Sequence, residues 1–236
     1  MCQSYRNSTA IELNNKAVQL LSQGDVVAAF EMITRASQIT MKGIANHRHI
    51  DAGNSTFRFH WEDCSKARDA IHENHKKRKL SPSASVWEGS SAYLFMRGLR
   101  ISVNNTNSHM GVDDLCACGF AWAIWFNQAI CCSVIGTMLG ADKGRKMLEL
   151  GWDMYLRVQR RIESEPASKH WNILLLGVVN NIACIYKDFC MLEEMRESLE
   201  ELAETILASK DIDAEDRRSF CLNLQILGSD IAAAAA

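Results

Sequence analysis

Two histidines flanking a glutamate form the first pattern in the chain that could support metal chemistry. The segment HENH, residues 72–75, places them three residues apart. A zinc-protease helix needs its histidines four residues apart on one face, with the glutamate beside the first and a third ligand elsewhere. No such third ligand stands nearby in the sequence, so we expect no zinc-protease site here.

Cysteines form the second pattern, with Cys116 and Cys118 close in sequence to Cys131, Cys132 and His109. Structural zinc sites usually combine two spaced cysteine pairs, whereas here Cys-x-Cys precedes two adjacent cysteines in an apolar run. The chain has 9 cysteines, an odd number that fits buried reduced thiols better than a secreted disulfide framework. We expect no metal, and a zinc cluster remains the alternative.

Glycines and carboxylates give no catalytic pattern. The stretch GTMLGADKGRK, residues 136–146, lacks the Gly-x4-Gly-Lys-Ser/Thr order of a phosphate loop, and no Gly-x-Ser-x-Gly elbow occurs. Glutamates gather on one helical face over residues 193–201, which is the usual pattern of a solvated surface. We expect no enzyme and no cofactor.

Composition limits the remaining classes. The 236 residues are 47% hydrophobic with a formal net charge of -2, which argues against nucleic-acid binding through a basic surface. There are only 2 prolines, so long helices meet few interruptions. The N-terminus has no signal-peptide pattern, so we expect a cytoplasmic protein. The basic run 76–79 would add nuclear import if it acts as a localisation signal.

An uncharged apolar run spans residues 116–141 and is long enough to cross a membrane. Asn127 and Gln128 lie near its middle, where lipid tolerates amides poorly. A helix that is apolar all round is equally typical of a protein core. We therefore favour no membrane contact, and a membrane-associated helical protein is the alternative.

Three stretches of the chain align on their asparagines. Asn15 is followed two, five and nine residues later by Ala17, Leu20 and Gly24. The same offsets give Ala129, Cys132 and Gly136 after Asn127, and Ala183, Tyr186 and Cys190 after Asn181. Apolar residues then recur at helical spacing in 26–36 and 192–202. Each stretch therefore predicts a helix, a turn and a second helix.

This pattern resembles the tetratricopeptide repeat, a helix pair of about 34 residues. Ala17, Ala29 and Ala36 match the small residues where the family's helices cross, and Leu13 stands at its tryptophan position. The third stretch departs from the family with Cys190 for glycine and Met195 for alanine, and the second has an irregular turn. The resemblance covers about half the chain.

The resemblance implies an all-α fold in one domain, residues 1–236: a short right-handed α-solenoid of antiparallel helix pairs. Its units would be residues 10–42, 121–162 and 172–208, with a capping helix at 215–231. Residues 43–119 form a long insertion, expected to be partly extended and partly disordered. Alternating residues in 57–62 and the run 92–103 predict strand pairing or extended packing, and the polar stretch 64–85 between them is expected to be mobile.

In such solenoids the first helix of each pair lines a concave face. The resemblance therefore implies a non-enzymatic interaction module or scaffold that binds a peptide or helix of a partner protein there. Primary amides can pair with the backbone of an extended peptide whatever its side chains. A purely structural role for the amides, and a homodimer formed through exposed first helices, are the alternatives. The predicted concave-face residues are Asn14, Asn15, Val18, Phe126, Asn127, Ile130, Asn180, Asn181, Cys184, Lys187 and Asn223.

Overall fold

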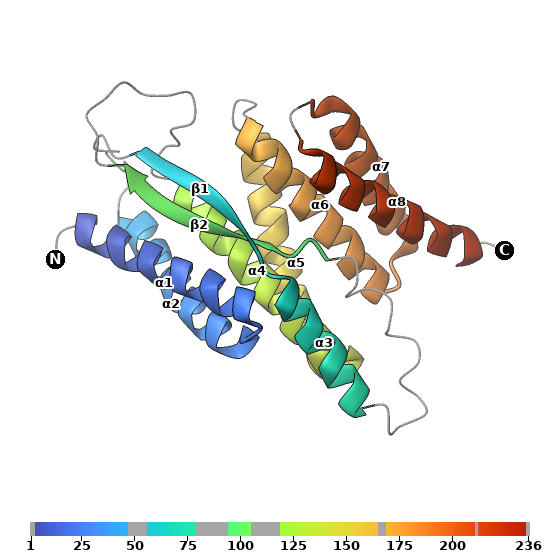
Figure 1. Ribbon diagram of the computed structural model, residues 1–236, viewed down its shortest axis with the longest axis horizontal. Helices are drawn as coiled ribbons and strands as arrows, with labels where there is room; N and C mark the ends of the chain where they lie inside the picture. Colours follow the sequence, from blue (N-terminus) through green and yellow to red (C-terminus); the bar gives the residue numbers. More distant parts are fainter. Residues whose placement is uncertain are drawn as a thin grey trace.

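Helices make up most of the structure, and a two-stranded sheet crosses them (Figure 1). The computed structural model of the protein describes residues 3–46, 56–78, 94–104, 119–164, 169–210 and 212–234. The expected all-α class is confirmed at the level of helix content, and the small sheet is an addition to it. The elements are α1 (Gln3–Gln23), α2 (Val26–Asn46), β1 (Thr56–Asp63), α3 (Ser65–Arg78), β2 (Arg97–Asn104), α4 (Gly119–Leu139), α5 (Ala141–Glu163), α6 (Lys169–Asp188), α7 (Leu192–Ala208) and α8 (Ala214–Ala234).

Most helices that follow one another in sequence also pack together. α1 contacts α2, α4 contacts α5, and α6 contacts α7, while α2 with α4 and α5 with α6 join these pairs. α8 packs on α7 and α6, and the two termini lie at opposite ends of the molecule (Figure 1). The strand β2 lies along α1 and α4.

The turn between α1 and α2 depends on Gly24. Its φ of 87° lies in the left-handed region, which glycine adopts without a Cβ clash. The Gly24 N–H donates to the Leu21 carbonyl and the Asp25 N–H to the Leu20 carbonyl, each at 2.9 Å. These two bonds satisfy carbonyls at the end of α1 in a Schellman arrangement, so α1 stops here and α2 can begin at Val26.

The turn between α6 and α7 repeats this arrangement with a cysteine. Cys190 has a φ of 56° and is the only described non-glycine residue with a positive φ. Its N–H donates to Lys187 at 3.0 Å, and the Met191 N–H donates to Tyr186 at 2.9 Å. Cys190 follows Asn181 at the same distance in sequence at which Gly24 follows Asn15. The two turns are therefore equivalent in bonding as well as in sequence.

The middle pair departs from that alignment. Gly136, the residue aligned with Gly24, lies inside α4, and the turn falls at Gly140, which has a φ of 79°. At the start of α5, a Cβ on Gly144 would lie 1.9 Å from the Gly136 carbonyl oxygen. Counted from its aligned asparagine, α4 therefore ends one turn later than α1. Gly136 and Gly144 allow the backbones of α4 and α5 to touch near this turn.

The insertion contains the sheet, as the alternating residues of 57–62 predicted. β1 and β2 are antiparallel, with Phe59 opposite Ile101 and Trp61 opposite Leu99. Strand pairing and extended packing against the helices, which were alternatives from sequence, both occur.

The expectation of a mobile stretch after β1 is wrong for residues 65–78, which form α3. Ala67 and Ile71 are buried, and α3 contacts both α1 and α4. Asp63 begins the helix by accepting from the Ser65 N–H at 3.0 Å. Burial of a few apolar side chains against other helices offsets the weak helical pattern of this polar segment. The run 79–85 and His109, Cys116 and Cys118 lie outside the described residues.

α4 is the helix that the sequence marked as a membrane candidate. Its segment Phe120–Leu139 has a mean hydropathy of 1.3, enough in length and composition for a span, and 78% of that window is buried inside the structure. Phe126, Asn127 and Ile130 are fully buried. Contacts with α5, α2 and β2 therefore bury most of the apolar surface of α4 inside the fold.

Candidate functional site

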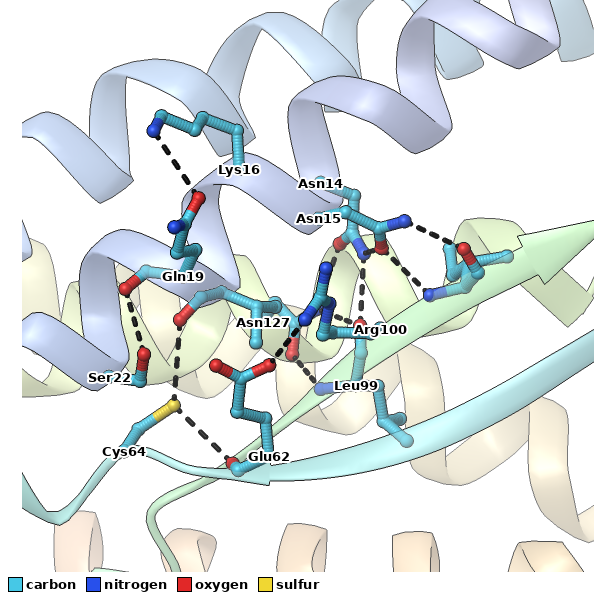
Figure 2. A network of polar contacts seen from close by, with 12 residues as sticks. Asn14, Asn15, Lys16, Gln19, Ser22, Glu62, Cys64, Leu99, Arg100 and Asn127 are labelled. Carbon is cyan, nitrogen blue, oxygen red and sulfur yellow. Dashed lines mark hydrogen bonds and ion pairs between the residues drawn. The ribbon is translucent and has the colours of Figure 1, made fainter.

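The side chain of Asn127 pairs with the backbone of Leu99 (Figure 2). Asn127 Oδ1 accepts from the Leu99 N–H at 2.9 Å, and Asn127 Nδ2 donates to the Leu99 carbonyl at 2.8 Å. One side-chain amide of α4 therefore takes the place of a neighbouring strand at this residue of β2. Both residues are buried, so the pair satisfies backbone groups that water cannot reach.

Two further asparagines repeat this pairing from α1 and α6. Asn15 Oδ1 accepts from the Ile101 N–H at 2.8 Å, and its Nδ2 donates to the Ile101 carbonyl at 2.7 Å. Asn181 Oδ1 accepts from the Phe95 N–H at 2.7 Å, and its Nδ2 donates to the Phe95 carbonyl at 3.2 Å. Three helices thus hold one extended segment, each by both backbone groups of a single residue.

The three held residues, Phe95, Leu99 and Ile101, share one edge of the segment. In a strand, the N–H and C=O of one residue point to one edge and those of the next residue point to the other. The opposite edge of β2 therefore faces β1, whose register pairs His60 with Arg100 and Glu62 with Gly98. The segment 95–101 lies between β1 on one edge and the asparagines on the other.

Asn14 adds a bond between the helices. Its Nδ2 donates to the Leu99 carbonyl at 2.9 Å, and its Oδ1 accepts from Asn127 Nδ2 at 2.8 Å. Asn14 is fully buried, while its neighbour Asn15 is partly exposed. The Leu99 carbonyl therefore has two amide donors, one from α1 and one from α4.

Asn180 and Asn223 form the corresponding link at the C-terminal end. Asn223 Nδ2, on α8, donates to Asn180 Oδ1 at 2.7 Å, and Asn180 Nδ2 donates to Asn181 Oδ1 at 3.1 Å. Asn181 also donates to the hydroxyl of buried Tyr155 at 2.9 Å. These amides join α8, α6 and α5, so the orientation of Asn181 is fixed by its neighbours.

Of the other predicted concave-face residues, Val18 packs against the same segment and Phe126 packs against β1. A Cβ on Gly98 would lie 2.9 Å from Val18 Cγ1, so Val18 sits directly against β2. The Phe126 ring meets the Trp61 ring edge-on, with centroids 6.0 Å apart. Ile130 and Cys184 are buried, and Lys187 is half-buried. The face that sequence predicted for a partner is covered here by the chain's own residues 94–104.

An ion pair fixes the segment where no asparagine does. Arg97 Nη1 lies 2.6 and 2.5 Å from the two carboxylate oxygens of Asp216 on α8, and 4.0 Å from Asp213. Burial raises the pKa of the Asp216 carboxyl despite the opposing effect of Arg97. The backbone N–H of Asp216 bonds Asp213 and lowers the pKa of that carboxyl.

A cavity of about 400 Å³ opens beside this ion pair. Carboxylates and two guanidinium groups line it, together with the first residues of the held segment. Arg68, one of the lining residues, donates to the Leu94 carbonyl at 2.8 Å. The lining residues are Asp63, Ser65, Arg68, Leu94, Phe95, Met96, Arg97, Asp213, Glu215, Asp216 and Ser219.

No family model, curated protein or solved structure matches this chain. Sequence reasoning missed the part played by Arg97, Gly98 and Asp216. The available signals were weak: an arginine-glycine step interrupts an apolar run, and Asp216 is one of several acidic residues near the start of α8.

The buried thiols in the described core are held in the protonated, unreactive form. Burial raises the pKa of Cys64 and Cys132 to about 12, and raises the pKa of Cys131 and Cys184 as well. A raised pKa keeps a thiol protonated, and the thiolate is the reactive form. Within the described ranges no group of three or more His, Cys, Asp or Glu side chains could hold a metal.

Proposed function

We propose that the protein is a non-enzymatic interaction module or scaffold whose asparagine-lined groove binds an extended segment of a partner protein. The observation that carries the proposal is the repeated pairing of Asn15, Asn127 and Asn181 with both backbone groups of one residue each. These hydrogen bonds involve only backbone groups of the bound segment. The same amides can therefore bind any extended segment whose side chains fit the groove.

We further propose that the helix pairs form a short right-handed solenoid of the tetratricopeptide type. The equivalent turns at Gly24 and Cys190 support this, because Gly24 follows Asn15 in sequence at the same spacing as Cys190 follows Asn181. So does the complete burial of Ala17, Ala29 and Ala36 at the expected helix crossings. In this reading α1, α4 and α6 are the first helices of three units, and their asparagines face one groove.

The chain's own segment must leave the groove, at least in part, before a partner enters. An intramolecular segment competes at an effective concentration of about millimolar for a short connection. A partner therefore needs either a high intrinsic affinity or a segment that opens locally. The module would then exchange an internal strand for an external one.

A peptide-library selection on the full-length protein tests the proposal. Selected peptides should increase hydrogen exchange in residues 94–104 when they bind, because they replace that segment. Asn15→Ala removes the same two amide bonds from the internal segment and from a bound peptide, so the comparison is made in a Gly98→Val background, which disfavours the internal segment. In that background, binding should weaken at least tenfold in Asn15→Ala. Lys16→Ala is the matched control, since Lys16 is exposed and bonds only Gln19 among its described contacts. Peptides that bind while exchange in 94–104 stays unchanged would place the interaction elsewhere and assign the asparagines a purely structural role.

A further inference from the structure

The residues that now fill the groove show which side chains it accepts. At the α6 end, the Phe95 ring stacks near Phe220, with centroids 5.0 Å apart, and meets Trp61 edge-on at 5.6 Å. A Cβ on Gly177 would lie 2.5 Å from Phe95 Cδ1, so the ring rests against the backbone of α6. This position is built for an aromatic side chain.

Two residues further along, the groove offers a negative charge. Arg97 binds both oxygens of Asp216, and its guanidinium lies 6.0 Å from the Trp61 ring centroid. Asp216 is 5% exposed, so its charge is poorly solvated and depends on a cationic partner. An arginine satisfies this site through two hydrogen bonds and a ring contact.

The next position leaves no room for a side chain unless Val18 or Cys64 shifts. A Cβ on Gly98 would lie 2.9 Å from Val18 Cγ1 and 3.2 Å from Cys64 Sγ. Leu99 and Ile101 follow, both buried and both held by asparagines, while Arg100 points outward to Glu62 at 3.1 Å. Met96, between Phe95 and Arg97, is also buried. The accepted order is thus aromatic, apolar, arginine, glycine, aliphatic, any residue, aliphatic.

We infer that the partner segment of this groove carries an arginine-glycine step flanked by apolar residues in that order, and that residues 95–101 are an internal ligand occupying its place. The inference rests on the proposed function and adds the chemistry of the partner. The amides supply affinity without sequence preference. Selectivity then comes from the ring site at Gly177, the carboxylate of Asp216 and the glycine contact at Val18.

A charge exchange between groove and ligand tests the inference on full-length protein. Arg97→Glu places a carboxylate of the internal segment beside Asp216, which weakens the internal ligand and leaves the groove intact. The labelled peptide LFMRGLRISVN should bind this variant at least tenfold more tightly than the counterpart LFMEGLRISVN, in which glutamate replaces the arginine equivalent to Arg97. Asp216→Arg should reverse that preference. The double variant R97E/D216R restores an internal ion pair and should bind neither peptide better than wild type does.

Peptides that bind the variants and raise exchange in 94–104, yet show no preference at the arginine or at a glycine-to-valine change, overturn the inference alone. Failure of both peptides to bind any folded variant overturns the proposed function as well.

The wild-type chain gives an independent check should the charge variants fail to fold. An internal ligand must open without global unfolding, so the amides of Leu99 and Ile101 should exchange at lower opening free energy than that of Ala129 in core helix α4. Equal opening free energies would mark 95–101 as a permanent part of the core and overturn the inference.

Discussion

Asn127 and Leu99 are 28 residues apart in sequence, yet the amide of the first pairs with both backbone groups of the second at 2.9 and 2.8 Å. This single contact joins α4, the most apolar helix, to the insertion that crosses it. Asn127 Nδ2 also donates to Asn14, so the same side chain connects α4 to α1. A polar residue inside an apolar helix is therefore a structural requirement of the strand that lies across it.

Replacing Asn127 by alanine should lower the free energy of unfolding by about 2–4 kcal/mol. The Leu99 N–H and Asn14 Oδ1 would lose their buried partners, and each unsatisfied group costs about 1–3 kcal/mol. The matched change Asn15→Ala should cost about 1 kcal/mol, because Asn15 is partly exposed and water can replace its bonds. Urea unfolding of both variants measures the difference. Equal costs would show that burial does not control these pairs.

Gly98→Ala should destabilise the protein by about 1–3 kcal/mol, because the added methyl would overlap Val18 and Cys64. Adding Val18→Ala should recover part of the loss by making room. Gly228→Ala in α8 is the control, since a Cβ there meets nothing within 4 Å. That helical change should stabilise by about 0.5–1 kcal/mol. Thermal unfolding of the variants measures these changes. A Gly98→Ala variant as stable as wild type would contradict the packing argument.

Cys190→Gly should raise the free energy of unfolding by about 0.5–1 kcal/mol. The left-handed backbone costs a residue with a Cβ about 1–2 kcal/mol, and the greater freedom of glycine in the unfolded chain offsets part of the gain. Cys190 is exposed, so the change removes no core contact. Cys190→Ala provides the comparison, as it removes the sulfur and keeps the strain. A glycine variant no more stable than the alanine variant would refute the explanation.

Stability should fall as pH rises above about 9. Burial raises the pKa of Cys64 and Cys132 from 9.0 to about 12, so in this range the unfolded thiols lose protons that the folded thiols keep. The unfolded state then binds fewer protons, and the free energy of unfolding declines by up to about 1.4 kcal/mol per pH unit for each thiol.

Urea titrations from pH 8, about one unit below the onset, to pH 10.5, about 1.5 units above it, measure this slope. Cys132→Ala removes one of the buried thiols and should make the decline shallower. Cys221→Ala is the control, because Cys221 is exposed. Identical slopes for wild type and Cys132→Ala would rule out the thiol contribution.

Much of the helical framework follows from local pattern. The repeat pattern predicted helix pairs at residues 10–42, 121–162 and 172–208, and the structure has helix pairs within residues 3–46, 119–163 and 169–208. The left-handed turn at Gly24 follows from a glycine after an amphipathic run. Alternation predicted the strands of the insertion. These features depend on neighbours a few residues apart, which a sequence displays directly.

The occupant of the asparagine-lined face was decided by tertiary structure. Asn15 binds Ile101 and Asn181 binds Phe95, each across 86 residues of chain. An amide pairs with any backbone, so nothing in its own sequence neighbourhood says whether that backbone belongs to a partner or to the same chain. α3 was missed for a related reason, because its stability comes from burying Ala67 and Ile71 against distant helices. The sequence by itself determined that a row of amides would be available. Only the folded chain, by bringing its own apolar segment 94–104 within reach of them, decided what they hold.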